Sequence, residues 1–217
     1  PMVWRKPDNT GKDLIAQAQS GTGKTGCFVT GALQIIDTEF KVNDKNVTQI
    51  LILAPTHELA GQILNVADSI GKFLKIKTKL LIGGTSVDKD REELDNDPPH
   101  IAIGTPGRVH DMIRRKYLKT DHIKSIILDE ADEMLSSGFK EQVYKIFQFM
   151  PNEVQICLFS ATMPPELENL TKKFMRSPSK ILVKTEELTL QGIAQYYVRI
   201  DGDAQKFLTI KDLFSSL

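Results

Sequence analysis

Long hydrophobic runs are absent from this sequence of 217 residues. No apolar stretch approaches the roughly 20 residues that a membrane-spanning helix needs, and no segment has the pattern of a secretory signal. We therefore expect a soluble protein with no membrane partner. The sequence begins at Pro1 rather than at methionine, which suggests a processed or excerpted piece.

Cysteine and net charge are also scarce. The two cysteines, Cys27 and Cys157, lie far apart in apolar segments and form no CxxC pair, which excludes a disulfide framework and a zinc-ligand spacing. We expect buried free thiols in a reducing compartment. Basic and acidic residues number 28 each, so no global field attracts the chain to nucleic acid. Any such binding must rely on local sites, such as helix N-termini and single arginines.

The sequence does contain a regular alternation of short apolar runs and helical patterns, which is typical of a parallel sheet with crossover helices. This indicates an α/β fold with a doubly wound parallel sheet and flanking helices. The expected strands are Asp13–Gln17, Gln49–Ala54, Lys77–Ile82, His100–Gly104, Ser125–Asp129, Val154–Phe159 and Lys180–Val183. Two helical stripes are expected to be core: Leu59, Ile63, Val66, Ala67, Ile70 and Leu74, then Phe139, Val143, Ile146, Phe147 and Met150.

A glycine-rich segment follows the first expected strand and reads Ala18-Gln19-Ser20-Gly21-Thr22-Gly23-Lys24-Thr25. Gly21 and Gly23 let the backbone approach a polyphosphate, and a helix starting near Lys24 directs its positive end at the phosphates. Lys24 is expected at the β- and γ-phosphates of ATP, and the Thr25 hydroxyl on Mg²⁺. Ala18 stands where the common pattern has glycine. The alternative is a glycine-rich turn with an incidental lysine.

Acidic residues follow the apolar strand that ends at Leu128 and read Asp129-Glu130-Ala131-Asp132. Asp129, at the carboxyl end of a central strand, is expected to hold Mg²⁺. Glu130 is then the group that orients and deprotonates the attacking water, and Asp132 is a supporting partner. An acidic first helical turn is the alternative, but it would not explain the paired phosphate loop. Together the two motifs predict a nucleotide-hydrolysing site.

With these motifs, the chain resembles the first RecA-like domain of the DEAD-box RNA helicases, which are P-loop NTPases. Within that family, its sequence is most similar to the group of eukaryotic initiation factor 4A and its close paralogues. Further segments match in order: Pro55-Thr56-His57-Glu58-Leu59-Ala60, Gly83-Gly84, Thr105-Pro106-Gly107-Arg108 and Ser160-Ala161-Thr162. The resemblance implies RNA contacts at Pro55, Thr56, Gly83, Gly84, Thr105, Gly107 and Arg108. It also implies that Asp132, Ser160 and Thr162 couple the nucleotide to the RNA.

The expected RNA contacts have a simple physical basis. Each of these segments follows a strand and opens a helix, so its N–H groups can bind backbone phosphates without reading bases. Arg108 would add one charge-assisted contact. Ser160 and Thr162 would offer hydroxyl groups to Asp132. Binding of single-stranded RNA should therefore be tolerant of sequence.

Departures from the family pattern concern one residue and two missing parts. His57 stands where the family has arginine, which puts the local contact in doubt. We expect residues 1–183 to form the ATP-binding domain, without the family's upstream adenine-reading segment. Residues 184–192 would be a linker, and residues 193–217 the opening strand (Gln195–Ile200) and helix (Ala204–Phe214) of a second RecA-like domain, whose γ-phosphate arginines are absent.

The expected function is that of an ATP-dependent RNA helicase using ATP and Mg²⁺, with a role in cytoplasmic translation initiation and scaffold proteins of that pathway as possible partners. A nuclear RNA-processing paralogue is an alternative. A nucleotide-dependent RNA clamp without catalysis is another, although the presence of Lys24, Glu130 and Thr162 argues against it. A DNA translocase is a third, because no spacing in the sequence separates a 2′-hydroxyl reader from a DNA binder.

Overall fold

The computed structural model describes residues 11–19, 21–136, 138–182, 196–200 and 202–216. The chain divides into two compact units, Pro1–Lys184 and Thr185–Leu217. The expected linker, residues 184–192, lies outside the described residues. No helix among the described residues is both long and apolar enough to cross a membrane.

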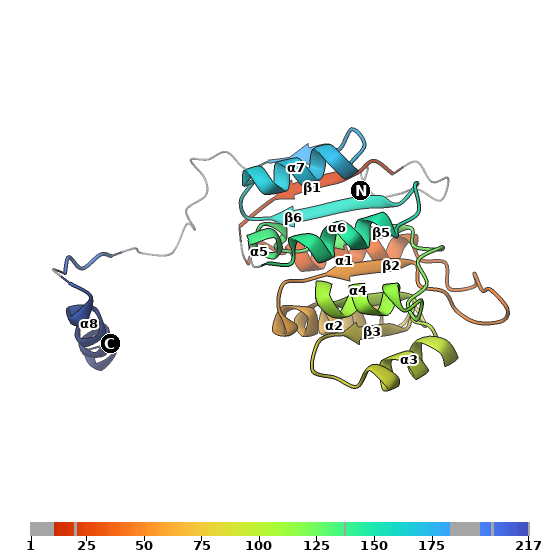
Figure 1. Ribbon diagram of the computed structural model, residues 1–217, viewed down its shortest axis with the longest axis horizontal. Coiled ribbons are helices and arrows are strands. Elements are labelled where there is room, and N and C mark those ends of the chain that lie inside the picture. The colour runs from red at the N-terminus through yellow and green to blue at the C-terminus, as the bar shows by residue number, and fades with distance from the viewer. Residues whose placement is uncertain (1–10, 20, 137, 183–195, 201, 217) are drawn as a thin grey trace. The chain divides into compact units, whose positions relative to one another are not determined.

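The first unit is built on a parallel sheet of seven strands in the order β3-β4-β2-β5-β6-β1-β7 (Figure 1). The doubly wound sheet and all seven expected strands are therefore confirmed. Their bounds are β1 Leu14–Gln17, β2 Ile50–Leu53, β3 Thr78–Leu81, β4 Ile101–Gly104, β5 Ser125–Leu128, β6 Gln155–Ser160 and β7 Ser179–Ile181.

Seven helices cover this sheet, with α4 and α6 in front of it in Figure 1 and α1 and α2 behind it. Their bounds are α1 Lys24–Ile35, α2 His57–Gly71, α3 Val87–Asn96, α4 Pro106–Arg114, α5 Ala131–Ser136, α6 Lys140–Gln148 and α7 Pro165–Phe174. Strand side chains alternate between two cores, as a strand covered on both faces requires. In β2, Leu51 and Leu53 pack into the core that contains α4 and α6, while Ile50 and Ile52 pack into the core that contains α1 and α2.

The helical stripe of α2 is only partly core. Ala60, Ile63 and Ala67 are buried, but Ile70 and Leu74 are 44% and 46% exposed, so their assignment to the core was wrong. Ile70 lies in the last turn of α2, which ends at Gly71, and Leu74 lies beyond the helix.

The amino ends of the strands are tied together by the buried carboxylate of Asp13. Its Oδ1 accepts a hydrogen bond from the amide of Ile156 at 2.8 Å, and its Oδ2 accepts one from the amide of Arg176 at 2.6 Å. The carbonyl of Asp13 accepts a third bond, from the amide of Ser179 at 2.8 Å. One residue thereby joins β1 to β6 and to the segment that leads into β7.

The two cysteines lie in different environments. Cys157 is fully buried on β6, where burial raises the pKa of its thiol to about 12 despite the nearby hydroxyl of Ser125. Cys27, in the first turn of α1, is exposed. The expectation of two buried thiols is therefore wrong for Cys27.

The second unit contains α8, Asp203–Ser216, which includes the expected helix. The strand expected at Gln195–Ile200 is not formed by residues 196–200, where Tyr196 and Tyr197 are 90% and 93% exposed. No strand partner occurs among the described residues of this unit, and a strand without a partner is not stable.

Candidate functional site

All the sequence motifs converge on one edge of the sheet, where the parallel strands end. The phosphate loop follows β1, the acidic block follows β5, and Ser160-Ala161-Thr162 spans the end of β6. These three strands are neighbours in the order β5-β6-β1. The other motifs follow β2, β3 and β4, which are neighbours in the order β3-β4-β2. The edge therefore has two halves, one for each group of motifs.

The phosphate loop has the backbone that its glycines allow. Gly21 and Gly23 have φ angles of 77° and 88°, in the left-handed region where glycine is unstrained. Gly23 is the N-cap of α1, so the helix begins with Lys24. Lys24 Nζ donates to the carbonyl oxygens of Ala18 at 2.8 Å and Gln19 at 3.3 Å, inside its own loop. Ser20, also part of this motif, lies outside the described residues.

The phosphate loop is held by hydrogen bonds to the end of the neighbouring strand, β6. The amide of Ala18 donates to the carbonyl of Ser160 at 3.0 Å, and Gln17 Nε2 donates to the carbonyl of Ala161 at 3.0 Å. The phosphate loop and the Ser160–Thr162 segment are thus held at a fixed spacing. Sequence reasoning missed this role of Gln17, for which the sequence offers no signal.

The acidic residues after β5 form a crowded cluster beside Lys24. Asp129 is buried, and burial raises the pKa of its carboxyl group, while Lys24 and the Glu130 amide oppose that shift. Burial, hydrogen bonding with Glu133 and the charge of Asp129 together raise the pKa of Glu130 to about 7. Glu130 also has a left-handed φ of 50°, an uncommon backbone angle for a side chain of this type. Its carboxyl group is thus poised to exchange a proton near neutral pH.

Asp132 connects the acidic block with the end of β6. Its Oδ2 accepts hydrogen bonds from the amide of Thr162 at 3.1 Å and from its hydroxyl at 2.6 Å. Burial pushes the pKa of Asp132 upward, but the hydrogen bonds from the hydroxyl and amide of Thr162 outweigh it and hold this pKa below its usual value. Ser160 Oγ is buried, and no hydrogen-bond partner for it occurs among the described residues.

The other half of the edge presents three helix N-termini. Thr56 caps α2 by accepting from the amide of Leu59 at 3.1 Å, and Ser86 caps α3 by accepting from the amide of Lys89 at 3.3 Å. Thr105 precedes α4, with Pro106 at the first position and no side-chain cap. Gly83, exposed Gly84 and exposed Gly107 leave the backbone accessible. Such ends attract anions because their N–H groups lack partners within the helix.

In this half, Arg108 is not placed as expected for a phosphate contact, and His57 departs from the family pattern. The Arg108 side chain is only 8% exposed and pairs with Asp90 on α3, instead of pointing freely from the edge. His57, in place of the family arginine, is exposed at the start of α2 beside Gly83. Sequence reasoning missed Asp90, since an acidic residue in a first helical turn is usually explained by the helix dipole.

The donor set at β1 and β5 fits Mg²⁺. Asp129 offers one carboxylate and Thr25 one hydroxyl, and Mg²⁺ in nucleotide sites typically takes one or two protein oxygens with phosphates and water. In the described part of the chain, no group of three histidine, cysteine, aspartate or glutamate residues could hold a metal by itself.

Comparison with known proteins adds sequence relatives to this geometry. Residues 5–170 match the family model described as DEAD/DEAH box helicase. The chain is 53% identical over 207 residues to "ATP-dependent RNA helicase eIF4A" of Coccidioides immitis, covering 95% of this chain and 50% of that protein. It is 52% identical to "Eukaryotic initiation factor 4A-9" of Nicotiana tabacum, covering 95% and 49%. The chain thus spans about half the length of these relatives.

Solved structures of related proteins have the same fold. Saccharomyces cerevisiae Dbp5 bound to RNA and ADP BeF3 superposes with a TM-score of 0.83 at 33% identity, covering 95% of this chain and 51% of that one. A DEAD box protein from Methanococcus jannaschii gives a TM-score of 0.74 at 36% identity, covering 94% and 53%. This chain therefore belongs to the DEAD/DEAH box helicase family, as its sequence, its RecA-like sheet and the motifs on one edge of that sheet show.

Proposed function

We propose that this chain is the nucleotide- and RNA-binding half of an ATP-dependent RNA helicase of the initiation factor 4A type. The observation that carries the proposal is the division of one sheet edge into a nucleotide half, after β5, β6 and β1, and an RNA half, after β3, β4 and β2. The relatives named ATP-dependent RNA helicase and the Dbp5 structure with RNA and ADP BeF3 support it.

On the nucleotide half, the chain would bind ATP by its phosphates. Lys24 would exchange the carbonyl oxygens of Ala18 and Gln19 for the β- and γ-phosphates, while the N–H groups of the loop from Gly21 to Thr25 surround them. Asp129 and Thr25 would hold Mg²⁺, which neutralises phosphate charge. Glu130 would take a proton from the attacking water, a role that a pKa of about 7 suits.

On the RNA half, the chain would bind the phosphate backbone. The N-termini of α2, α3 and α4 present N–H groups and the Pro55-Thr56, Gly83-Gly84 and Thr105–Gly107 segments at one edge. Contacts of this type read no bases, so the affinity should fall with salt and vary little with RNA sequence. The choice of RNA over DNA rests on the relatives.

The Asp132–Thr162 contact would transmit changes from the nucleotide half toward the RNA half. It joins the segments after β5 and β6, both in the nucleotide half, and β5 lies next to β2, the first strand of the RNA half. In a complete helicase, ATP and RNA would close two RecA-like domains, melt a short duplex locally, and reopen after hydrolysis. Its role would be in cytoplasmic translation initiation together with scaffold proteins of that pathway, and the relative named "Eukaryotic initiation factor 4A-9" supports the initiation role.

Glu130→Gln tests the catalytic assignment. In this chain joined to a second RecA-like domain from a relative, ATP binding should remain while RNA-stimulated hydrolysis falls by about a hundredfold or more, because the amide keeps the shape but accepts no proton. Hydrolysis is measured by phosphate release and ATP binding by titration calorimetry. Glu166→Gln, the same exchange in the exposed first turn of α7, is the matched control and should retain full activity.

The outcomes separate the possible functions. Wild-type hydrolysis by Glu130→Gln would remove Glu130 from the base role. ATP-dependent RNA binding without hydrolysis in the unsubstituted protein would favour the nucleotide-dependent clamp. Equal affinity for DNA and RNA would favour the translocase, and co-purification with nuclear partners would favour the RNA-processing paralogue.

A further inference from the structure

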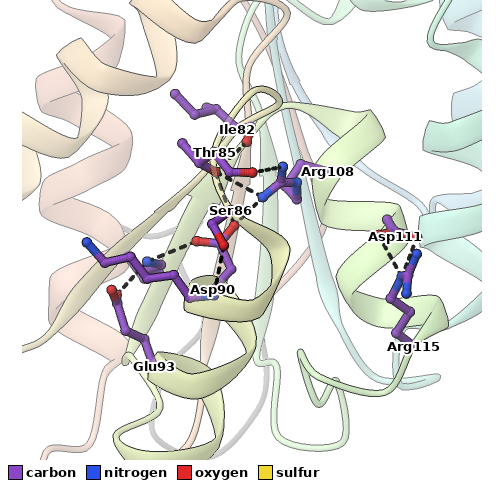
Figure 2. Close-up of polar contacts among 10 residues, drawn as sticks. Ile82, Thr85, Ser86, Asp90, Glu93, Arg108, Asp111 and Arg115 are labelled. Carbon is purple, nitrogen blue, oxygen red and sulfur yellow. Dashed lines mark hydrogen bonds and ion pairs between the residues drawn. The ribbon is translucent and has the colours of Figure 1, made fainter.

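A charge cluster connects the loop after β3, α3 and α4 within the RNA half of the edge (Figure 2). Arg108, in the first turn of α4, donates from Nη1 to the Asp90 carboxylate and to the Thr85 hydroxyl at 2.9 Å. Its Nη2 donates to the carbonyl of Thr85 at 2.7 Å. Both guanidinium ends are therefore engaged by α3 and by the loop after β3. Arg108 thus joins two of the three RNA-facing segments.

The cluster neutralises its own charge. Lys79 on β3 lies 3.1 Å from the second oxygen of Asp90 and 2.5 Å from Glu93. The side chains of Asp90 and Arg108 are only 4% and 8% exposed. Two acids and two bases thus alternate in the order Glu93, Lys79, Asp90 and Arg108, and the best buried pair, Asp90 and Arg108, forms one end of the row. Little of the Arg108 charge is left to act on an anion at the surface.

The backbone beside this cluster is closely packed. A Cβ added to Gly104, at the end of β4, would lie 2.0 Å from the carbonyl oxygen of Leu81 at the end of β3. The two loops that follow these strands therefore start from one tight junction. Arg108 joins them again one turn later, so their relative position is fixed at two points.

We propose that Arg108 is a positioning residue: clamped by Asp90, it sets the spacing between the Gly83-Gly84-Thr85 loop and the N-terminus of α4, and backbone amides rather than its guanidinium contact RNA phosphates. The inference rests on the proposed function. For a direct phosphate contact, Arg108 would have to leave the buried Asp90 carboxylate, and separating a buried, hydrogen-bonded ion pair is costly.

RNA affinity and its salt dependence distinguish positioning from direct contact. Binding of a single-stranded oligouridylate to the 217-residue chain would be measured between about 50 and 200 mM salt. Arg108→Lys keeps the charge but loses the forked donor geometry, so we expect about tenfold weaker binding from the lost preorganisation with an unchanged salt slope. Asp90→Asn should weaken binding to a similar extent, again with the slope unchanged.

Arg115→Lys is the matched control. Arg115 lies just after α4 and pairs with Asp111 on the surface (Figure 2), with 45% of its side chain exposed. The same exchange there should leave RNA affinity unchanged. Thermal unfolding, together with ATP titration at the other half of the edge, would show that each variant is folded. If Asp90→Asn does not fold, Arg108→Lys decides the question by itself.

Direct contact predicts the opposite pattern. Arg108→Lys would then keep most of the affinity, and Asp90→Asn would bind RNA as well as or better than the wild type because it releases the guanidinium. Arg108→Gln would lower the salt slope by about 0.7, the value for one phosphate on a single strand. Any of these results overturns the positioning role alone. Absence of RNA binding by the unsubstituted chain would overturn the proposed function and this inference with it.

Discussion

At the scale of single residues, Glu130 combines two unusual properties. It has a left-handed backbone angle, and the pKa of its carboxyl group is raised to about 7 by burial, by Glu133 and by Asp129. Left-handed angles of large side chains persist where the surrounding structure determines them. Here the segment lies between β5 and α5, with Asp129 Oδ1 accepting from the Glu130 amide at 3.1 Å.

The raised pKa of Glu130 predicts a pH-dependent stability. The folded chain holds a proton on Glu130 up to about pH 7, whereas the unfolded chain releases it near the ordinary value. Folding is therefore favoured at low pH, and this contribution is lost as the pH rises toward 7. Glu130→Gln abolishes the ionisation, so relative to wild type it should gain about 1 kcal/mol or more between about pH 5 and pH 8 after discounting for solvent screening.

Urea unfolding in buffer free of metal and nucleotide measures this effect, since bound Mg²⁺ or ATP would alter the charge at the site. Glu166→Gln provides the comparison, because Glu166 lies exposed in the first turn of α7. Parallel stability profiles for Glu130→Gln and wild type would show that Glu130 ionises normally in the folded chain.

The motif residues were predictable because loop chemistry fixes their placement. Few other structural roles combine glycines in a strand-to-helix loop with carboxylates directly after an apolar strand. Because both motifs follow strands of one parallel sheet, they are expected at the same edge of it. The partner of Arg108 was not predictable, because Asp90 lies 18 residues away on another element. Only the packing of β3 against β4 brings the two side chains together.

At the scale of elements, the strands were predictable from apolar runs, and the order of the strands was not. Apolar runs such as Ile50–Leu53 indicate strands that are buried on both faces. They do not indicate which strands are neighbours, such as the pairing of β1 with β6 and β7. Ile70 and Leu74 fit the helical period of α2 and yet are exposed, since periodicity does not show where the sheet ends. Residues 196–200 have a strand-like composition and form no strand, because strands are stabilised by partners.

The Asp13 contacts predict a large local contribution to stability. Asp13→Ala would leave the buried amide of Ile156 and the amide of Arg176 without their acceptors, and we expect a loss of about 3 kcal/mol in the free energy of unfolding. Chemical denaturation measures this loss. Asp121→Ala, at an exposed position, should change stability by less than about 0.5 kcal/mol. Similar values for the two variants would mean that the Asp13 bonds are replaced by water.

At the scale of the whole molecule, the chain should be a poor ATPase by itself. It spans about half the length of its relatives, and the γ-phosphate arginines of the family are expected in the other half. An arginine in that role is worth about a thousandfold or more in phosphoryl transfer. RNA-stimulated phosphate release by the 217-residue chain should therefore rise by about that factor when a relative's second RecA-like domain is fused to it.

A fusion whose catalytic arginines are replaced by lysine is the control, and it should remain at the low rate of the chain alone. Efficient RNA-dependent turnover by the monomeric 217-residue chain would contradict the prediction. All the residues needed for hydrolysis would then lie within this one RecA-like domain.

The pairing of β1 with β6 has a consequence for the order of events during synthesis. Asp13 and its partner Ile156 are separated by 143 residues, so the first strand leaves the ribosome long before the strand beside which it belongs. At typical elongation rates of 5–20 residues per second, this interval is about 7 to 30 seconds. The phosphate loop depends on the same neighbour, through the bond from Ala18 to Ser160. A nascent chain should thus be unable to bind ATP until β6 has been made, although the loop itself is synthesised well before that strand.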